Sequence, residues 1–269
     1  MSAFIEKLSL YLHYKLQPVG WRLMKEPHPQ KWVFIVGCYN SGTTLLHRVL
    51  EQHPTVGSMP NEGQFFNTVL PSGADFNLRR LWAIKPELFY LDAKSTGIDV
   101  NKLKRQWAWM YNDVRKPLLV EKTILNSART QFLQKHFPNA YFICLFRNGY
   151  AVAEGIHRKE NHAMDLCIKQ WTVSNEILLR DMEHLKDKMM LRYEDFTAEP
   201  SKYLDAIAKF LEIEPFPQQV LYNEFKIHKE EGTISNRNEK SLKSLSVEDL
   251  EVIRKEGGEL LKKLGYDVI

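Results

Sequence analysis

A segment rich in glycine, serine and threonine contains the residues best suited to bind an anion. Residues 37–44 read Gly-Cys-Tyr-Asn-Ser-Gly-Thr-Thr and stand between an apolar run and a helical pattern. When such a loop joins a strand to a helix, its backbone N–H groups and the helix N-terminus face a bound phosphate. The hydroxyl groups of Ser41, Thr43 and Thr44 are further donors. We therefore predict a phosphate-binding loop here.

Thr43 distinguishes this loop from the Walker sequence G-x-x-x-x-G-K-[ST]. The spacing matches, but Thr43 stands where that sequence has its lysine. Kinases and ATPases use this lysine on the β- and γ-phosphates of a triphosphate. The loop therefore suits a single terminal phosphate better. A P-loop small-molecule kinase and a catalytically weak nucleotide-binding module stay open as alternatives.

Polar residues also follow three other apolar runs that we predict to be strands. The four predicted strands are Lys31 to Val36, Leu118 to Val120, Tyr141 to Phe146, and Met189 to Tyr193. Lys122 follows the second strand, Arg147 follows the third, and Tyr193 closes the fourth. Because ligands bind outside the carboxyl ends of parallel strands, we expect these side chains and the loop at one edge of the sheet.

Helical patterns separate the predicted strands and complete the fold prediction. Apolar residues recur at helical spacing over Thr43 to His53, Asp165 to Leu185, Ser201 to Leu211, and Val247 to Leu264. The alternation predicts an α/β fold, a P-loop-like parallel sheet with helices on both faces. We expect a single domain over residues 1–269, with an aromatic-rich helical insertion at 65–116 and a basic loop or lid at 227–246.

The composition excludes several classes of protein. The 269 residues are 44% hydrophobic and 26% charged, which is typical of a globular domain and rules out a disordered or collagen-like chain. A net charge of +4 is too small to indicate a nucleic-acid partner and favours a small anion. Three cysteines without CxxC spacing predict neither a disulfide framework nor a metal site, and favour a reducing compartment.

The N-terminal residues 2–16 have apolar side chains at helical spacing. They predict a short amphipathic helix that packs on the core or makes peripheral contact with a membrane. Charged residues among them argue against a signal peptide or a transmembrane segment, and we expect a cytoplasmic protein. Nothing in the sequence indicates the oligomeric state.

Taken together, the ordered motifs resemble a known family. The set consists of Ser41-Gly42-Thr43-Thr44 after one strand, Arg147 after a later strand, and Tyr193-Glu194-Asp195 leading to Pro200. From about Val33 to Leu211 the chain resembles the sulfotransferases that use 3′-phosphoadenosine 5′-phosphosulfate (PAPS). It looks most like the branch with tyrosylprotein and bacterial sulfotransferases. The resemblance implies in-line transfer of a sulfuryl group to a hydroxyl acceptor, without a required metal ion.

The resemblance also implies roles for individual residues. The loop residues Asn40, Ser41, Gly42, Thr43 and Thr44 would bind the donor's 5′-phosphate and sulfate. Arg147 and Arg158 would bind its 3′-phosphate, and Tyr193 would line the nucleotide site. Glu62 matches a carboxylate base, and Lys122 matches a lysine at the transferring group. The aromatic insertion and the basic tail would form the acceptor walls and a lid. The acceptor itself, a carbohydrate, a lipid-linked or small alcohol, or a tyrosine, stays open.

Two residues depart from the family pattern. Asn40 replaces the usual arginine or lysine, and Gly155 replaces a serine on the 3′-phosphate. We expect Asn40→Arg to raise turnover or donor affinity. Arg48 is the candidate substitute cation in the natural chain, although its helix position is expected to point it outward. We expect Gly155 at a helix start, where its backbone N–H reaches the 3′-phosphate, so that Gly155→Ser tightens binding of the product nucleotide, 3′-phosphoadenosine 5′-phosphate (PAP).

Three other residues are weaker candidates for chemistry. His47 and His53 are rival bases, but the pattern places His47 on the polar face of its helix and His53 at the helix end. Cys38 lies in the loop without an identifiable base beside it, so a nucleophilic role is disfavoured.

Overall fold

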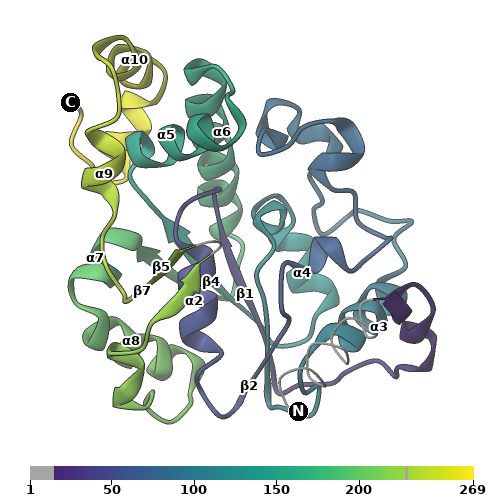
Figure 1. Ribbon diagram of the computed structural model, residues 1–269. Helices are drawn as coiled ribbons and strands as arrows, with labels where there is room; N and C mark the ends of the chain where they lie inside the picture. The colour runs from purple at the N-terminus through teal and green to yellow at the C-terminus, as the bar shows by residue number, and fades with distance from the viewer. Residues whose placement is uncertain (1–14, 228–229) are drawn as a thin grey trace.

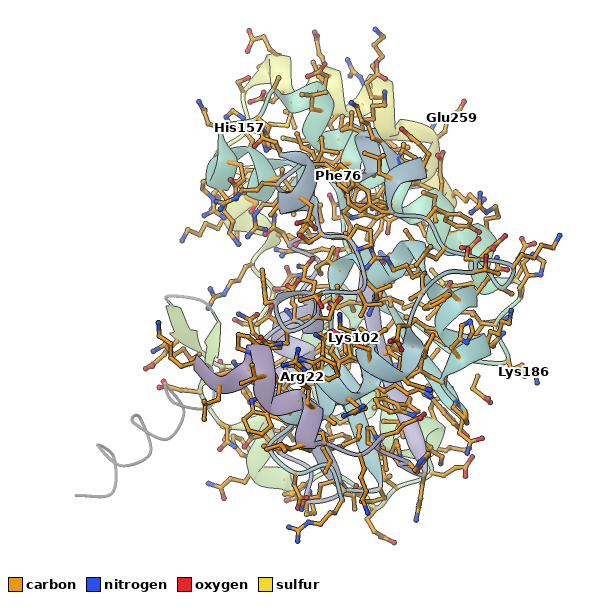
Figure 2. The ribbon with its side chains drawn as sticks, turned by 90° about the vertical axis from the view of Figure 1, so that its right-hand side faces the viewer. Arg22, Phe76, Lys102, His157, Lys186 and Glu259 are labelled. Atoms are coloured by element: carbon orange, nitrogen blue, oxygen red, sulfur yellow. The ribbon has the colours of Figure 1, made fainter. Side chains whose placement is uncertain are left out.

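The computed structural model describes residues 15–227 and 230–269. Most of the predicted N-terminal helix at 2–16 lies outside the described residues. Within them, no helix has the length and apolarity that crossing a membrane requires. Residues 15–20 are helical and continue into the short 3-10 helix η1 (Trp21–Leu23). Arg22 and Lys102, both labelled in Figure 2, lie over the ring of Trp21, and the contact with Lys102 helps to attach this segment to the following fold.

A parallel sheet of five strands forms the centre of the molecule (Figure 1). Its order is β2-β3-β1-β4-β5, and every pairing is parallel. The strands are β1 (Lys31–Gly37), β2 (Val56–Ser58), β3 (Leu118–Glu121), β4 (Ala140–Phe146) and β5 (Asp187–Arg192). The α/β prediction is confirmed. β2 is an additional edge strand whose three residues are too few to show a pattern in the sequence.

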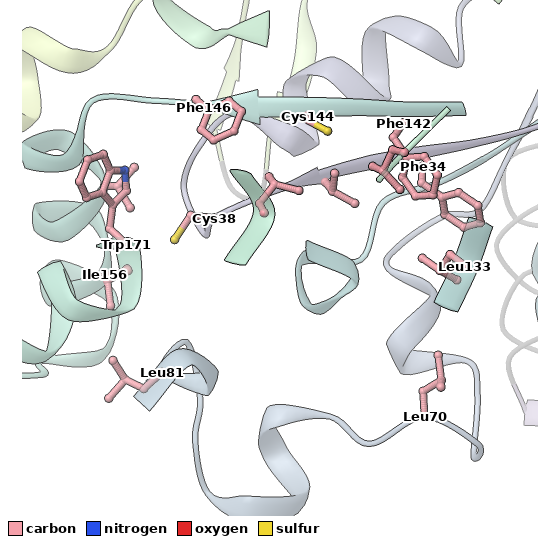
Figure 3. Close-up of a cluster of buried hydrophobic side chains, with 14 of the residues drawn as sticks. Phe34, Cys38, Leu70, Leu81, Leu133, Phe142, Cys144, Phe146, Ile156 and Trp171 are labelled. Atoms are coloured by element: carbon pink, nitrogen blue, oxygen red, sulfur yellow. The ribbon is translucent and has the colours of Figure 1, made fainter. Parts of the chain in front are cut away.

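Alternate residues of β1 contribute to two separate cores. Trp32, Phe34 and Val36 join the core on one face of the sheet, and Val33 and Ile35 join the core on the other. This is the two-residue period of a strand that is buried on both sides. Figure 3 shows part of the first core, where the rings of Phe34 and Phe142 stack with their centroids 5.4 Å apart.

Helices cover both faces of the sheet. The first face carries α3 (Val100–Met110), α4 (Thr130–His136), α5 (Gly149–Glu160), α6 (Met164–Met182) and α10 (Val247–Lys263). The second carries α2 (Thr43–Leu50), α7 (Tyr193–Ala198) and α8 (Pro200–Leu211). All four predicted helical patterns correspond to helices, but Tyr193 begins α7 instead of closing β5.

The region 65–116 is less helical than predicted. Apart from α3 it contains single 3-10 turns: the end of η2 (Gly63–Phe65), then η3 (Gly73–Phe76), η4 (Trp82–Ile84) and η5 (Pro86–Leu88). Trp82 and Phe89 pack in a small core of their own with Leu125 and Ile177. Tertiary packing of these aromatic residues, more than local helix preference, therefore holds the region in place.

The predicted basic loop at 227–246 contains regular structure. After η7 (Gln218–Leu221), β6 (Phe225–Ile227) pairs with β7 (Glu230–Gly232) in an antiparallel ribbon. The short helix α9 (Asn238–Leu242) follows and packs against α5. One further 3-10 helix, η6 (Ile124–Ala128), lies directly after β3.

Candidate active site

The predicted phosphate loop joins the carboxyl end of β1 to the start of α2. Two of its residues have left-handed backbone conformations, Asn40 with φ 59° and Gly42 with φ 92°. Asparagine tolerates this conformation better than most residues. A Cβ on Gly42 would lie 2.5 Å from Cδ2 of Tyr193, so glycine also allows the close approach of that ring. Sequence and backbone thus agree on the shape of the loop.

Donors of the loop fit an anionic group. Within the described chain, no side chain caps the N-terminus of α2, and Oγ of Ser41 and Nδ2 of Asn40 are buried without hydrogen-bond partners. Buried donors without partners are costly unless a ligand or solvent satisfies them. Hydroxyl, amide and backbone N–H donors at a helix N-terminus form a site for phosphate or sulfate.

The loop opens into a cavity of about 790 Å³, which falls in the range of small-molecule sites. Eight of the ten predicted site residues line it, whereas Ser41 and Lys122 are not among the lining residues. We divide the lining into two groups: the loop, the strand-end residues and the segment 233–241 form one, and Gln64, Phe65, Ser72, Gly73, Ala74 and Ile124 form the other. We call these the donor end and the acceptor end. The lining includes Asn40, Gly42, Thr43, Thr44, Glu62, Arg147, Arg158 and Tyr193.

Lys122 connects the two ends of the cavity. Its Nζ donates to Oγ1 of Thr44 at 3.2 Å and pairs with Oε1 of Glu62 at 3.0 Å. The side chains of Lys122 and Glu62 are only 5% and 14% exposed, so water screens the pair weakly. The resemblance implied that Lys122 and Glu62 act in the same reaction, and their side chains are in contact.

Glu121 binds the backbone directly after Glu62 and directly after Lys122. This carboxylate is buried and accepts hydrogen bonds from the backbone N–H of Gly63 at 2.8 Å and of Thr123 at 3.0 Å. It also accepts from the hydroxyl of Thr123 and the amide of Asn126. Burial raises the pKa of Glu121, and these donors oppose that shift. Gly63 follows Glu62 and Thr123 follows Lys122, so one carboxylate sets the backbone positions beside both residues.

Arg147 extends from the end of β4 to the loop and to α9. Nη1 donates to the carbonyl of Asn40 at 2.6 Å, and Nε donates to Oδ1 of Asn238 at 2.8 Å. Its guanidinium lies 4.2 Å from the centroid of the Tyr193 ring, and burial lowers its pKa. The Tyr193 hydroxyl in turn donates to the carbonyl of Ser235 at 2.8 Å. Sequence reasoning did not find Asn238, because a lone asparagine in a polar tail has no distinguishing pattern.

Glu194, in α7, connects the start of α5 to α9 around Arg147. Its Oε1 accepts from the backbone N–H of Asn148 at 3.0 Å and from Nδ2 of Asn238 at 2.7 Å. Its Oε2 accepts from the hydroxyl of Tyr266 at 3.1 Å. The acidic residue after Tyr193 therefore fixes the start of α5 and the position of α9 around Arg147.

Arg158 and Lys159 are adjacent in sequence but reach different partners. Nε of Arg158 pairs with Glu154 at 2.7 Å, and the side chain is half-exposed at the rim of the cavity. Nζ of Lys159 donates to Oδ1 of Asn40 at 3.0 Å. Of the two, Lys159 is therefore the residue that reaches the loop.

The weaker candidates lie outside the cavity lining. His47 is buried instead of lying on a polar face; burial and the nearby Lys122 lower its pKa to about 3, so it is a poor base. His53 is bound by Thr55 and the carbonyl of Glu214. Arg48 is paired with Glu51 and does not replace a cation at Asn40. Burial raises the pKa of Cys38 to about 11, which makes its thiol unreactive.

Gly155 lies in the middle of α5, so the expectation of a helix start there is wrong. Its backbone N–H belongs to a helical turn and is not an end group. A Cβ on Gly155 would lie 3.0 Å from Nδ2 and 3.1 Å from Cγ of Asn40. The two positions at which the chain departs from the family pattern are therefore in contact.

The fold and the site together define the class of protein. A parallel sheet places a lysine-free phosphate loop, a buried lysine and carboxylate pair, and an arginine around one cavity, as in P-loop-like nucleotide-dependent transferases. A model of the Sulfotransferase family matches residues 33–218, more than half of the chain. The chain belongs to the sulfotransferase family and is a sulfotransferase enzyme.

Related sequences and structures agree with this assignment. Protein-tyrosine sulfotransferase A of Caenorhabditis elegans is 25% identical over 88% of this chain and 67% of its own length. The protein-tyrosine sulfotransferase of Drosophila melanogaster is 27% identical over 78% of this chain, which spans 43% of the fly protein. The sulfotransferase domain of an olefin synthase from Synechococcus PCC 7002 has the same fold, with a TM-score of 0.63 and 20% identity over 91% of this chain and 98% of that domain.

Proposed function

We propose that this enzyme transfers the sulfuryl group of PAPS to a hydroxyl of a carbohydrate, of a lipid-linked or small alcohol, or of a tyrosine. The observation that carries the proposal is the contact chain from Thr44 through Lys122 to Glu62. It runs from the phosphate loop to a carboxylate beside the acceptor end. A donor bound at one end and an acceptor bound at the other would therefore meet at Lys122.

The donor end matches the chemistry of PAPS. Ser41, Thr43, Thr44 and the N-terminus of α2 offer neutral donors to the 5′-phosphate and sulfate. Arg147 offers a guanidinium for the 3′-phosphate, and Tyr193 offers a ring beside it. Among the residues that the structure describes, no cluster of histidine, cysteine, aspartate and glutamate could bind a metal ion.

The reaction follows from this arrangement. The acceptor oxygen forms a bond to sulfur while the bond from sulfur to the 5′-phosphate oxygen breaks in line, and that oxygen keeps the electron pair. Glu62 takes the acceptor's proton, and Lys122 neutralises the charge that grows on the leaving oxygen. PAP and a sulfated acceptor are the products.

Phe65 supports an acceptor with an apolar portion beside its hydroxyl. Its ring is 62% exposed and lines the cavity next to Gln64 and Glu62. An exposed aromatic side chain in a cavity is more often a contact surface than part of a core. Ser72, Gly73 and Ala74 also line the cavity.

Two measurements test the proposal. First, PAP should raise the thermal unfolding temperature, whereas ATP with magnesium should not. Second, labelled PAPS with a panel of sugars, alcohols and tyrosine peptides should give a labelled product, and Lys122→Ala should lower its rate about 100- to 1,000-fold. Stabilisation by PAP without any product would identify a nucleotide-binding module instead. Stabilisation by ATP with magnesium alone would favour the kinase alternative.

A further inference from the structure

The phosphate loop has no cation of its own but is surrounded by cations from elsewhere. Residues 37–44 contain neither lysine nor arginine. Three basic side chains nevertheless meet at Asn40: Arg147 binds its carbonyl at 2.6 Å, Lys159 binds Oδ1 at 3.0 Å, and Nη1 of Arg80 lies 3.5 Å from the same Oδ1. The Asn40 side chain is therefore an acceptor shared by two cations.

Arg80 is fixed by its backbone conformation and by contacts with Glu160 and Tyr39. Its backbone has φ 56°, a left-handed conformation that arginine rarely adopts. Nε pairs with Glu160 at 3.1 Å, and the guanidinium lies 5.4 Å from the centroid of the Tyr39 ring. Residues kept in such a conformation often serve a site. Arg80 lines the cavity together with Lys159 and Glu160.

Gly155 provides the space that Asn40 occupies. A Cβ at this position would come within 3.0 Å of the Asn40 amide, closer than side chains normally pack. The amide also cannot be exchanged freely for a cation, because Arg80 and Lys159 already lie beside its oxygen. An asparagine over a glycine is thus the arrangement that admits both cations.

The cluster has an excess of positive charge. Burial and the neighbouring guanidiniums of Arg80, Arg158 and Arg147 lower the pKa of Lys159 to about 8, while Glu160 opposes this shift. Glu160 itself pairs with Arg80, and Glu154 pairs with Arg158. An anion bound in the cavity would relieve the repulsion that stays between Lys159 and its neighbours.

We propose that Arg80 and Lys159, brought together by Asn40 over Gly155, bind a phosphate group of the nucleotide donor. The inference rests on the proposed function, because it assigns the ligand of that same cavity. The inference assigns Arg80 to the donor end, although this residue belongs to the 65–116 insertion that we expected to form the acceptor wall.

Binding of PAP and of adenosine 5′-monophosphate (AMP) to the full chain, measured by calorimetry, tests the proposal. Arg80→Ala and Lys159→Ala should each weaken PAP binding about 10- to 100-fold, as expected for loss of a charge-assisted contact. Lys159→Arg should retain it. Arg115→Ala is the matched control, because Arg115 is an exposed arginine that pairs with Asp113 away from the cavity lining. Unchanged unfolding temperatures would show that the variants fold.

The two nucleotides separate the possible sources of the anion. An equal loss for PAP and AMP would place the cations at the 5′ end of the donor. A loss for PAP alone would place them at its 3′-phosphate. Either result supports the proposal. Variants that bind PAP as tightly as the wild type would overturn it and leave the proposed function intact, whereas a wild-type chain that does not bind PAP would overturn both.

A second, independent test places a positive charge on residue 40 itself. The sequence led us to expect tighter donor binding from Asn40→Arg, but Arg80 and Lys159 already lie beside Asn40. In the wild-type chain this substitution should therefore weaken PAP binding or leave it unchanged, because the new cation meets these two. In the R80A/K159A background the same substitution should raise PAP affinity at least tenfold above that of the double variant. Tighter binding by Asn40→Arg in the wild-type chain would overturn the proposal. Gly155→Ser should likewise weaken PAP binding, because its side chain displaces Asn40.

Discussion

The two ends of the cavity are built in different ways. At the donor end, each side chain follows a strand of the central sheet or is bound to one that does, as Arg147 is bound to the loop and to α9. At the acceptor end, Phe65 and the Ser72 to Ala74 turn belong to short 3-10 turns outside the sheet. Under the proposed function, the sheet would therefore position the groups that carry out transfer, and the short turns of the insertion would select the acceptor. Four predictions test this division.

Glu62, on the boundary between the ends, should show the largest effect. We expect Glu62→Gln to lower kcat about 100- to 10,000-fold, because the amide cannot accept the acceptor's proton. The KM for PAPS and the calorimetric Kd for PAP should stay within a factor of about two. A kcat close to the wild-type value would assign proton removal to another group. The donor end and the acceptor end would then not meet at Lys122.

Arg147 should act on the donor end alone. Arg147→Ala removes contacts to the loop and to Asn238, and we expect PAP affinity to fall about 10- to 150-fold in calorimetry. The KM for the acceptor should not change. If the acceptor KM rises in parallel with the loss of PAP affinity, the two ends are not independent.

The pH dependence of donor binding should report Lys159. Its pKa of about 8 means that the ammonium is charged below this pH, so PAP affinity should be full near pH 6.5 and fall about tenfold as pH rises through 8. Arg80, Arg147, Arg158 and Glu160 are the charged groups that act on Lys159. Lys159→Arg should flatten the profile. A fall that persists in that variant would belong to another group.

Phe65 should show the smallest effect, confined to the acceptor end. Phe65→Ala removes an exposed ring, and we expect the acceptor KM to rise about 2- to 10-fold. PAP affinity should be unchanged. Phe76→Ala, which removes another exposed ring of the insertion that is absent from the cavity lining, is the matched control. Equal effects of both substitutions would indicate a general loss of packing.

The difference between the ends also explains what the sequence could predict. Four of the five strands and the loop were predictable, because short apolar runs ending in polar residues place those residues at one edge of the sheet. Contacts between segments distant in sequence were not predictable. Arg80 reaches Asn40 across 40 positions, and nothing local marks it.

Burial was a second source of error. The pattern around α2 placed His47 on a polar face, but the helix packs so closely against its surroundings that the imidazole is buried. The aromatic region 65–116 was predicted to be helical, but its turns follow the shape of the neighbouring core. In both cases tertiary packing outweighed the local preference.

The buried carboxylate of Glu121 has a consequence for how new specificities could be made. It anchors the backbone of Gly63 to the end of β3, upstream of the point where the acceptor-end residues begin. Segments after Phe66 can therefore be exchanged with those of other sulfotransferases while Glu62 keeps its place, provided that Arg80 is retained at the donor end. Chimeras that keep residues 62–64 and 121–123 should accept foreign hydroxyl compounds without losing their chemical step.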